Sequence, residues 1–279
     1  MSRGVLGPAL LFCPADRPER YAKAAERADT VILDLEDAVA PAAKAAARDA
    51  LVESALEESP LDPSRTVVRV NPVGTPEFAL DCEAVRQTAY RTIMLAKTEA
   101  AADVAALREA LGDVDVIALC ETARGIVEAV SIARAEGVTA LMWGAEDLVA
   151  SLGGTSSRTA SGAYRAVALH ARSQVLLAAG AAGKQAMDAV YVDIADTAGL
   201  KEEADDAVAS GFGSKACIHP GQVATIRAAF APTDDEVEHA RALLAAAKHE
   251  RGVFTYEGRM VDEPILRHAR SVVARAGAL

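Results

Sequence analysis

Residues 30–35 read TVILDL, a short run of mostly β-branched and other apolar residues, and residues 36–44 continue as EDAVAPAAK. A run that is hydrophobic at nearly every position is typical of a parallel β-strand covered on both faces. Pro41 stands where the first turn of a helix accepts proline, because the missing N–H has no helical partner there. The stretch therefore predicts a β-strand, a short polar turn and the start of a helix.

The same unit recurs along the chain, where short apolar runs alternate with longer Ala-rich, charged stretches of helical character. The predicted strands cover residues 9–13, 30–35, 66–71, 92–96, 115–120, 140–143, 189–194 and 215–218. Eight such strands, each followed by a helix, favour the α/β class and a (β/α)₈ TIM barrel, whose typical length of ~250 residues is close to the 279 present. Periodicity does not show whether a sheet closes, so an open doubly wound sheet is the alternative.

Composition and charge exclude several classes of function. Lys and Arg number 29 against 40 Asp and Glu, a formal net charge of −11. A nucleic-acid binder, which needs a basic face, is therefore not expected. No segment approaches the ~20 apolar residues of a membrane span. The four cysteines form no CxxC pair, which argues against a zinc ribbon or a disulfide framework and for a reducing cytoplasm. We expect a soluble cytoplasmic protein without nucleic-acid or membrane partners.

The chain continues beyond the eighth predicted strand and helix. We expect the barrel to occupy residues 1–232 and a C-terminal helical extension to occupy residues 233–279. The extension contains Asp262 and ends in a helix that begins at about Pro264. Because the barrel is already complete without it, we expect the extension to pack over the barrel mouth or against a neighbouring subunit.

Two acidic residues follow consecutive predicted strands. Chemistry in a βα-barrel takes place at the carboxyl ends of the strands, and neighbouring strands lie ~4.8 Å apart, so the side chains of Glu121 and Asp147 should be neighbours. Two carboxylates this close share a proton or bind a cation, and Mg²⁺ is usually held by two carboxylates with water and substrate oxygens. Acids also favour helix N-termini, so capping of the following helices is an equally weighted alternative.

Cationic residues follow other predicted strands. Arg69 interrupts a Val-rich strand and suits recognition of a carboxylate by its forked donors, although an ion pair with Asp34 or Glu36 is the alternative. Asp34 and Glu36 share one strand face and need a cationic partner, which Lys97 could supply. Arg17 lies just past the first strand, where it could meet a phosphate, although a solvated helix face is the simpler alternative.

Six segments at these strand ends together resemble the citrate lyase β-subunit-like family, within the wider HpcH/HpaI aldolase and malyl-CoA lyase superfamily. The segments are residues 11–20 (LFCPADRPER), 31–39 (VILDLEDAV), 69–71 (RVN), 119–123 (LCETA), 144–148 (GAEDL) and 217–222 (CIHPGQ). The resemblance ends with residues 260–262 (MVD) and so covers nearly the whole chain in the right order. The motifs are specific in combination, although each alone would be weak.

The resemblance implies a barrel of the phosphoenolpyruvate/pyruvate type that breaks or makes a carbon–carbon bond beside a thioester carbonyl. Its implied cofactor is Mg²⁺, for which Mn²⁺ can substitute. The implied substrates are short 3-hydroxyacyl-CoA thioesters such as malyl-, citramalyl- or citryl-CoA. Cleavage would give acetyl-CoA or a related acyl-CoA and a small 2-oxoacid such as glyoxylate, pyruvate or oxaloacetate. The resemblance also implies a homotrimer or homohexamer.

Individual roles carry over from the matching motifs. Glu121 and Asp147 match metal ligands, and Arg69 matches a residue that contacts the substrate carboxylate and carbonyl. Asp262 matches a catalytic acid/base delivered by the tail of an adjacent subunit. The further candidates are Glu36 and Asp37 for catalysis and, together with Arg69, Glu121 and Asp147, residues Gly144, Ala145, Glu146, Lys97 and Arg17 for substrate binding.

Two other functions stay open. Thioester hydrolysis on the same fold, as in related malyl-CoA thioesterases, would release free CoA without a matching 2-oxoacid. A subunit that acts only on citrate bound to an acyl-carrier protein would be inert on CoA thioesters until its partners were added. The intact Asp262 tail favours activity without such partners.

Overall fold

A computed structural model of the protein describes residues 6–55, 59–248, 250 and 252–278. The chain divides into two compact units, Met1–Ile226 and Arg227–Leu279. The predicted division after residue 232, and the predicted role of the extension at a neighbouring subunit, stay predictions. Positions 249, 251 and 279 of that extension lie outside the described residues.

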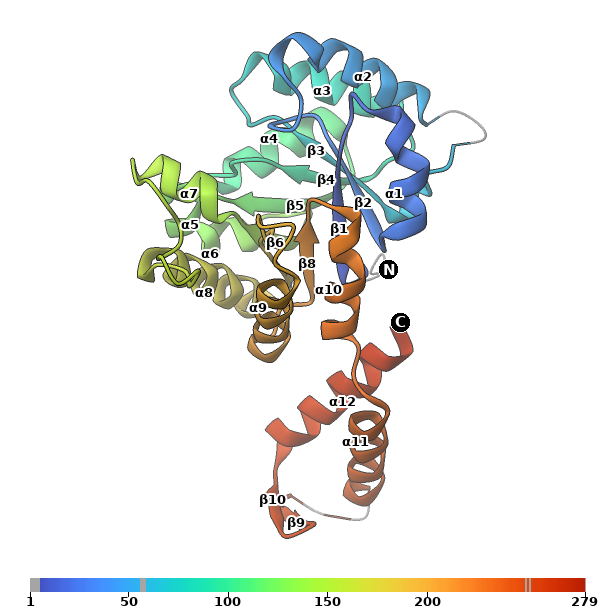
Figure 1. Ribbon diagram of the computed structural model, residues 1–279, viewed down its shortest axis with the longest axis vertical. Helices are drawn as coiled ribbons and strands as arrows, with labels where there is room; N and C mark the ends of the chain where they lie inside the picture. The colour runs from blue at the N-terminus through green and yellow to red at the C-terminus, as the bar shows by residue number, and fades with distance from the viewer. Residues whose placement is uncertain (1–5, 56–58, 249, 251, 279) are drawn as a thin grey trace. The chain divides into compact units, whose positions relative to one another are not determined.

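The first unit is a closed barrel of eight parallel strands (Figure 1). Consecutive strands pair in chain order, and the last strand pairs with the first, so the sheet has no open edge. The predicted TIM barrel is therefore confirmed over the open sheet. The strands are β1 (Ala9–Pro14), β2 (Thr30–Asp34), β3 (Thr66–Val70), β4 (Thr92–Leu95), β5 (Asp115–Cys120), β6 (Val138–Trp143), β7 (Gln185–Asp188) and β8 (Ser214–Cys217).

Helices cover the outside of this barrel (Figure 1). Pro18, Pro41 and Pro76 each stand in the first turn of a helical segment, as expected for a residue without an N–H. None of the described helices is long and apolar enough to cross a bilayer. The α-helices are α1 (Tyr21–Arg27), α2 (Lys44–Glu53), α3 (Pro76–Arg86), α4 (Ala101–Leu111), α5 (Ala123–Val127), α6 (Ala129–Ala133), α7 (Ala145–Ser151), α8 (Ala166–Ala181), α9 (Thr197–Ser210) and α10 (Val223–Phe230). Short 3₁₀ helices are η1 (Pro18–Arg20), η2 (Pro41–Ala43), η3 (Pro63–Arg65) and η4 (Pro220–Gln222).

Apolar side chains from all eight strands fill the barrel lumen. They form one buried cluster of Leu10, Ile32, Val67, Met94, Ile117, Leu119, Ala140, Met142, Met187 and Ala216. Because side chains alternate along a strand, the residues between them face the surrounding helices. The lumen is therefore a packed core, and the space for a ligand lies above it, beyond the carboxyl ends of the strands.

The predicted seventh strand was wrong. The structure places β7 at Gln185–Asp188, whereas residues 189–194 form an irregular segment after it. The true strand is polar at both ends, and hydropathy alone assigns a residue such as Asp188 to solvent. Its carboxylate is nevertheless fully buried, because Lys215 Nζ and Arg172 Nε donate to it at 2.9 Å each. Partners that are distant in sequence therefore offset the free-energy cost of burying this charged strand residue.

The charged residues behind β7 and β8 form a buried ionic cluster. The Lys215 ammonium, which has no exposed surface, lies 2.9 Å from both Asp188 and Glu203. The Trp143 indole N–H donates to Asp188 at 2.8 Å. Burial would raise the pKa of Asp188, but the positive charges of Lys215 and Arg172 outweigh it and lower that pKa. The cluster joins β6, β7 and β8 to the helices outside them.

Replacing Lys215 by Met should destabilise the protein by about 3–5 kcal/mol, because it leaves the buried carboxylates of Asp188 and Glu203 without their shared cation. Urea unfolding of both proteins measures the difference. Lys201→Met is the matched control, since the exposed Lys201–Asp205 pair on α9 should contribute about 0.5 kcal/mol or less. Equal losses from the two substitutions would contradict a special contribution of the buried cluster.

The second unit contains α11 (Asp234–Ala247), the antiparallel pair β9 (Phe254–Tyr256) and β10 (Arg259–Val261), and α12 (Glu263–Ala278). Both residues of the hairpin turn, Glu257 and Gly258, have left-handed φ values of 49° and 75°, the conformation that tight two-residue turns require. Asp262 directly follows β10, and its Oδ1 accepts a hydrogen bond from the Ile265 N–H at 3.3 Å. Asp262 therefore marks the start of the terminal helix.

Candidate active site

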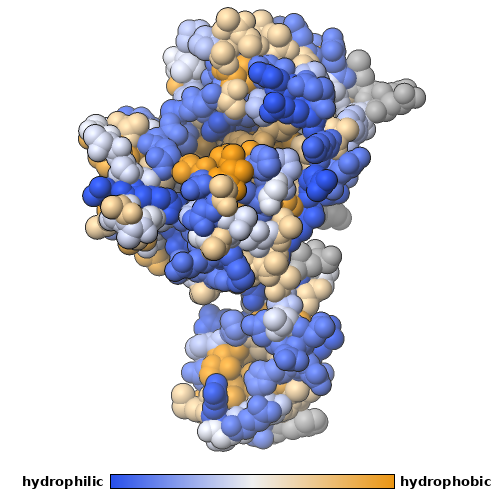
Figure 2. Space-filling model, viewed as in Figure 1, coloured by the Kyte–Doolittle hydropathy of each residue, from blue (hydrophilic) through white to orange (hydrophobic). Residues whose placement is uncertain are grey.

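Three charged residues reach the barrel mouth because of strand alternation. Asp34, Arg69 and Glu121 each lie two positions beyond a member of the lumen cluster, so their side chains point the same way, one layer higher. All three line a cavity of about 170 Å³ at this end of the barrel. In Figure 2 a hydrophobic patch lies among hydrophilic side chains near the middle of this unit, over the region where Figure 1 labels β5 and β6.

The cavity collects most of the residues predicted for substrate binding. Arg69, Glu121 and the segment Gly144–Asp147 all line it. The sequence interpretation missed the apolar part of the wall, although period-two alternation back from Glu121 and Gly144 could have found Leu119 and Met142. The full lining is Phe12, Asp34, Ala38, Arg69, Leu119, Glu121, Met142, Trp143, Gly144, Ala145, Glu146, Asp147, Ala189, Val190 and Ile218.

Arg69 is held by carboxylates while it lines the cavity. Its Nε and Nη2 donate to the two oxygens of Asp34 at 2.7 and 2.6 Å, and its Nη1 lies 3.1 Å from Glu36. Its guanidinium carbon also lies 4.8 Å from the centre of the Phe12 ring. Burial alone would lower the pKa of Arg69, but the negative charge of Asp34 has the larger opposite effect. The pKa is therefore raised, and the side chain stays a cation. Arg69 therefore forms the predicted ion pair with Asp34 and also lines the cavity, where a substrate carboxylate could meet it.

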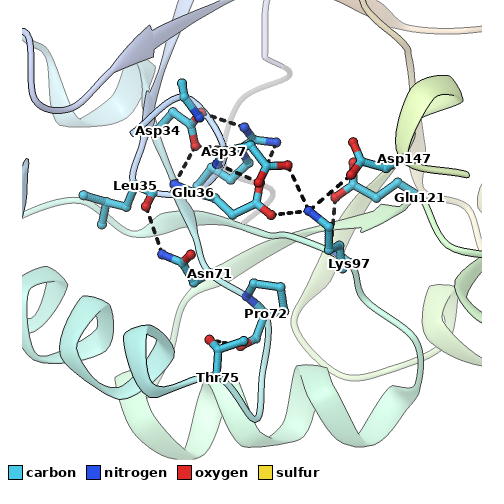
Figure 3. Close-up of polar contacts among 12 residues, drawn as sticks. Asp34, Leu35, Glu36, Asp37, Asn71, Pro72, Thr75, Lys97, Glu121 and Asp147 are labelled. Carbon is cyan, nitrogen blue, oxygen red and sulfur yellow. Dashed lines mark hydrogen bonds and ion pairs between the residues drawn. The ribbon is translucent and has the colours of Figure 1, made fainter. Parts of the chain in front are cut away.

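Lys97 links the acids around the mouth (Figure 3). Its Nζ donates to Glu36 and, at 3.0 Å, to Asp37, and it lies 3.3 Å from Asp147 Oδ1. The residue has a left-handed φ of 47°, which is rare for a long side chain. In that conformation the Lys97 N–H donates to Glu121 Oε1 at 3.1 Å. One strained residue therefore positions both members of the predicted metal pair.

Two side chains, Lys44 and Asn71, hold the backbone at Leu35 and Glu36 by hydrogen bonds. Lys44 Nζ donates to the carbonyls of Leu35 and Glu36 at 2.8 and 2.9 Å, and Asn71 Nδ2 donates to Leu35 at 2.9 Å. Buried Asp81 accepts from the side chain of Asn71 at 2.6 Å. The turn after β2, which carries Glu36 toward Lys97, is thus rigidly held (Figure 3).

Glu121 and Asp147 face one another at the mouth (Figure 3). Burial, and next the negative charge of Asp147, raise the pKa of Glu121 to about 8. Glu121 does not cap the following helix, because the Thr122 side chain accepts from the Gly125 N–H and caps α5. Asp147 does lie in the first turn of α7, where a negative charge is favourable. The alternative that these acids lie at helix N-termini therefore holds for Asp147, and the prediction that Glu121 caps a helix is wrong.

The pair fits a hard divalent cation. Carboxylate oxygens are the donors that Mg²⁺ prefers. Gly144 keeps the space beside Glu121 open, because a Cβ at residue 144 would lie 2.8 Å from Glu121 Oε2. Within the described part of the chain no group of three or more His, Cys, Asp or Glu side chains is arranged for a metal. Glu121 and Asp147 would therefore be the protein's share of the ligands, with water or substrate oxygens completing the shell.

Glu146 is anchored by a loop that the sequence did not indicate. The buried Ser157 hydroxyl donates to Glu146 Oε1 at 2.6 Å. The next residue, Arg158, stacks over the Tyr164 ring at 3.7 Å and pairs with Glu203 at 2.7 Å. The loop between α7 and α8 is thereby tied to α9 and to the buried ionic cluster. The Ser157–Glu146 and Arg158–Glu203 pairs are 11 and 45 residues apart, beyond the reach of a local pattern.

Four predicted site residues of the first unit do not line the cavity, and a fifth belongs to the second unit. The Arg17 side chain is about half exposed, its Nε lies 3.7 Å from Asp16, and it does not line the cavity. Asp262 belongs to the second unit. Glu36, Asp37 and Lys97 form the ion-pair network beside the cavity without belonging to its lining.

Known proteins are similar to this chain in sequence and in fold. The family profile of HpcH/HpaI aldolase/citrate lyase matches residues 9–220. The citrate lyase subunit beta-like protein of Mycobacterium tuberculosis is 56% identical over 277 residues, which cover 99% of this chain and 98% of that protein. The crystal structure of CitE from Mycobacterium tuberculosis with magnesium, acetoacetate and coenzyme A superposes with a TM-score of 0.89 at 56% identity, covering 98% and 99% of the two chains. A Mycobacterium tuberculosis citrate lyase beta subunit with oxaloacetate and magnesium gives a TM-score of 0.77 at 57% identity over 83% of this chain and 100% of that one.

Proposed function

The chain belongs to the HpcH/HpaI aldolase/citrate lyase family of lyases, and from that premise we propose that it cleaves or forms short 3-hydroxyacyl-CoA thioesters with Mg²⁺ as cofactor. The candidate substrates are malyl-, citramalyl- and citryl-CoA, and the products are an acyl-CoA and a small 2-oxoacid. The similar structures that contain magnesium with coenzyme A or with oxaloacetate support this choice.

One observation carries the proposal: a neighbouring pair of carboxylates and a buried guanidinium line the same cavity. Glu121 and Asp147 would hold Mg²⁺, or Mn²⁺ in its place, beside Gly144. When bound there, the metal supplies Lewis-acid polarisation of the substrate oxygens. Arg69, which lines the same cavity, supplies a fixed positive charge and N–H donors. A 2-oxoacid and a thioester enolate are the products whose developing charges such a site stabilises.

The chain's own residues account for binding and charge stabilisation. Arg69 would bind the carboxylate of the acid half and stabilise negative charge as the carbon–carbon bond breaks, without reorganising, because Asp34 already fixes it. The backbone of Gly144–Asp147 would orient the acid half against the cavity wall. Glu36 would act through Arg69 and Lys97, and Asp37 through Lys97, because these are the cations that each acid contacts.

Two proton movements complete the reaction. The hydroxyl proton leaves as the carbon–carbon bond breaks, and the enolate carbon gains a proton to give the acyl-CoA. Following the family resemblance, we assign the second transfer to Asp262, delivered from the tail of an adjacent subunit in a homotrimer or homohexamer. Arg17, at the outer end of β1, is our candidate for a CoA phosphate contact, since its side chain is solvent-accessible.

The test is a panel of malyl-, citramalyl- and citryl-CoA incubated with the protein and Mg²⁺, with products identified by mass spectrometry. Equimolar 2-oxoacid and acyl-CoA are expected. Free CoA without a 2-oxoacid would replace the proposal by a thioesterase. A chain that is inert on the whole panel, but active when citrate lyase α and carrier subunits are added, would be a complex-dependent subunit.

Gly144→Ala should weaken Mg²⁺ binding about tenfold, because the new Cβ would lie 2.8 Å from both Glu121 Cβ and Oε2 and must displace that carboxylate. Calorimetric titration of Mg²⁺ measures the change. Gly180→Ala in α8 is the matched control, since its Cβ would meet nothing within 4 Å. Unchanged Mg²⁺ affinity in Gly144→Ala would show that the space beside Glu121 is not needed.

Mixing the two inactive variants Asp262→Ala and Glu121→Ala should restore part of the activity once their subunits exchange. Each mixed assembly would pair an intact Asp262 from one chain with an intact Glu121 from another. Activity of the mixture is compared with each variant alone, and native mass spectrometry confirms the exchange. Confirmed exchange without recovery would mean that Asp262 does not act across a subunit boundary.

We also place the protein in the cytoplasm. All four cysteines are buried in the structure, and none of them is joined in a disulfide. Burial raises the pKa of the Cys13 thiol to about 11, so this thiol is mostly protonated and unreactive near neutral pH. A reducing compartment suits such residues.

A further inference from the structure

Lys97 places a positive charge directly beside the proposed metal pair (Figure 3). Its Nζ lies 3.3 Å from Asp147 Oδ1, and among the described residues Lys97 is the one cation within ion-pair distance of Asp147. The backbone N–H of Lys97 donates to Glu121 Oε1 at 3.1 Å. The same residue therefore contacts both carboxylates, one through a charged group and the other through its backbone.

Two further acids hold the ammonium of Lys97 in this place. Its Nζ donates to Glu36 and, at 3.0 Å, to Asp37. Glu36 is buried and lies 3.1 Å from Arg69 Nη1, so it is itself fixed. The left-handed φ of 47° at Lys97 is costly for a long side chain and persists because these contacts determine it. The ammonium is thus held from the side of Glu36 and Asp37, independently of Asp147.

The ammonium and a metal ion would act on the same carboxylates. Burial alone would lower the pKa of Lys97, but its hydrogen bond to Glu36 and the negative charges of Glu36 and Glu121 raise it, so the ammonium keeps its charge. A divalent cation bound by Glu121 and Asp147 would lie close to this charge. Like charges a few ångströms apart repel, and solvent screens this repulsion only in part, because the Lys97 side chain is 29% exposed.

We infer that Lys97 is a positioning residue that limits the affinity of the site for Mg²⁺, because its ammonium balances the acids of the barrel mouth and competes with the metal for Asp147. The inference rests on the proposed metal pair, Glu121 and Asp147, and concerns how tightly this pair holds its cation. The flexible four-carbon stem of lysine lets the ammonium move away from Asp147 while Glu36 and Asp37 still bind it. One cation can then replace another without leaving the clustered carboxylates unbalanced.

The test is Lys97→Met, which keeps the length of the side chain and removes its charge. Calorimetric titration of the full-length protein, freed of metal with a chelator, should show Mg²⁺ binding about tenfold tighter than in the wild type. The Tm of the variant without metal should fall by about 3 °C or more, because Glu36 and Asp37 lose their shared ammonium. A purely structural role of Lys97 would instead weaken both metal binding and stability.

Three further variants serve as controls. Lys97→Gln removes the charge but keeps an N–H donor for Glu36, so it should also tighten Mg²⁺ binding, and it replaces the Met variant if that protein does not fold. Lys97→Arg keeps the charge, and its Mg²⁺ affinity should stay within about threefold of the wild type. Lys201→Met removes an exposed lysine that pairs with Asp205 on α9, and it should change neither the affinity nor the Tm measurably.

The outcomes separate the inference from the proposed function. Unchanged or weaker Mg²⁺ binding in the neutral Lys97 variants, with normal binding in the wild type, would overturn the inference and leave the proposed lyase function intact. Equal tightening in Lys201→Met would also overturn it, because the effect would then come from net charge and not from the position of Lys97. A wild-type protein that binds no Mg²⁺ would overturn the metal pair, and with it both the proposed function and the inference.

Discussion

Replacing Glu121 by Gln or Asp147 by Asn is expected to lower kcat/KM by about 10³-fold or more and to abolish measurable Mg²⁺ binding. Each substitution keeps the shape of the side chain but removes one of the two anionic ligands, and a catalytic metal typically supplies several kcal/mol of stabilisation to the transition state. Steady-state kinetics at several Mg²⁺ concentrations, with calorimetric titration of the metal, measures both effects.

The loss of activity in these variants should not be caused by unfolding of the protein. Glu121 is buried beside Asp147, and their mutual repulsion contributes to its raised pKa, so neutralising one acid should not unfold the barrel. Glu136→Gln is the control, because Glu136 is an exposed acid whose contact is with Arg108, and it should keep normal activity. Retained activity in the Glu121 or Asp147 variants, with an unchanged Mg²⁺ titration, would refute the metal assignment.

Arg69→Lys should lower kcat/KM by about 10²–10³-fold although the positive charge is kept. The forked guanidinium bonds both oxygens of Asp34 and still presents N–H groups to the cavity. An ammonium is a point charge that cannot make this two-sided contact, and losing one preorganised donor costs about this much in comparable sites. Kinetics at saturating Mg²⁺ is the measurement.

Arg48→Lys is the matched control for Arg69→Lys. Arg48 also bridges two acids, Glu77 and Asp81, but it lies between α2 and α3, away from the cavity lining. Both substitutions should reduce the free energy of unfolding, by about 1–3 kcal/mol, and only Arg69→Lys should impair catalysis. Equal kinetic effects, or near-normal kcat/KM in Arg69→Lys, would remove Arg69 from the proposed mechanism.

Strand ends were the most predictable part of the candidate site. A residue two positions beyond a buried strand residue must point the same way, so Asp34, Arg69 and Glu121 could be placed at the barrel mouth from local order alone. Asp147 was placed near Glu121 because the two acids follow consecutive predicted strands, and the structure shows Asp147 in the first turn of α7. Because the segment between β6 and α7 is short, Asp147 still lies near Glu121 although it belongs to the helix.

Partnerships across the sequence were the least predictable part. The prediction from hydropathy placed the seventh strand at residues 189–194, because hydropathy treats Asp188 as a surface residue. The structure buries Asp188 through Lys215 and Arg172, which lie 27 and 16 residues away. The hydrogen bond from Ser157 to Glu146 and the left-handed conformation of Lys97 had no sequence signal either.

The amino-acid sequence by itself determined the alternation of strands and helices and the acidic and basic residues that follow the strands. These features depend on neighbours in the chain, and hydrophobic runs, helix-starting prolines and side-chain alternation encode them locally. Only the tertiary structure decided that the sheet closes and which charges neutralise one another. Those outcomes depend on which distant residues meet, because the cost of burying a charge is set by its partner and not by its own position in the sequence.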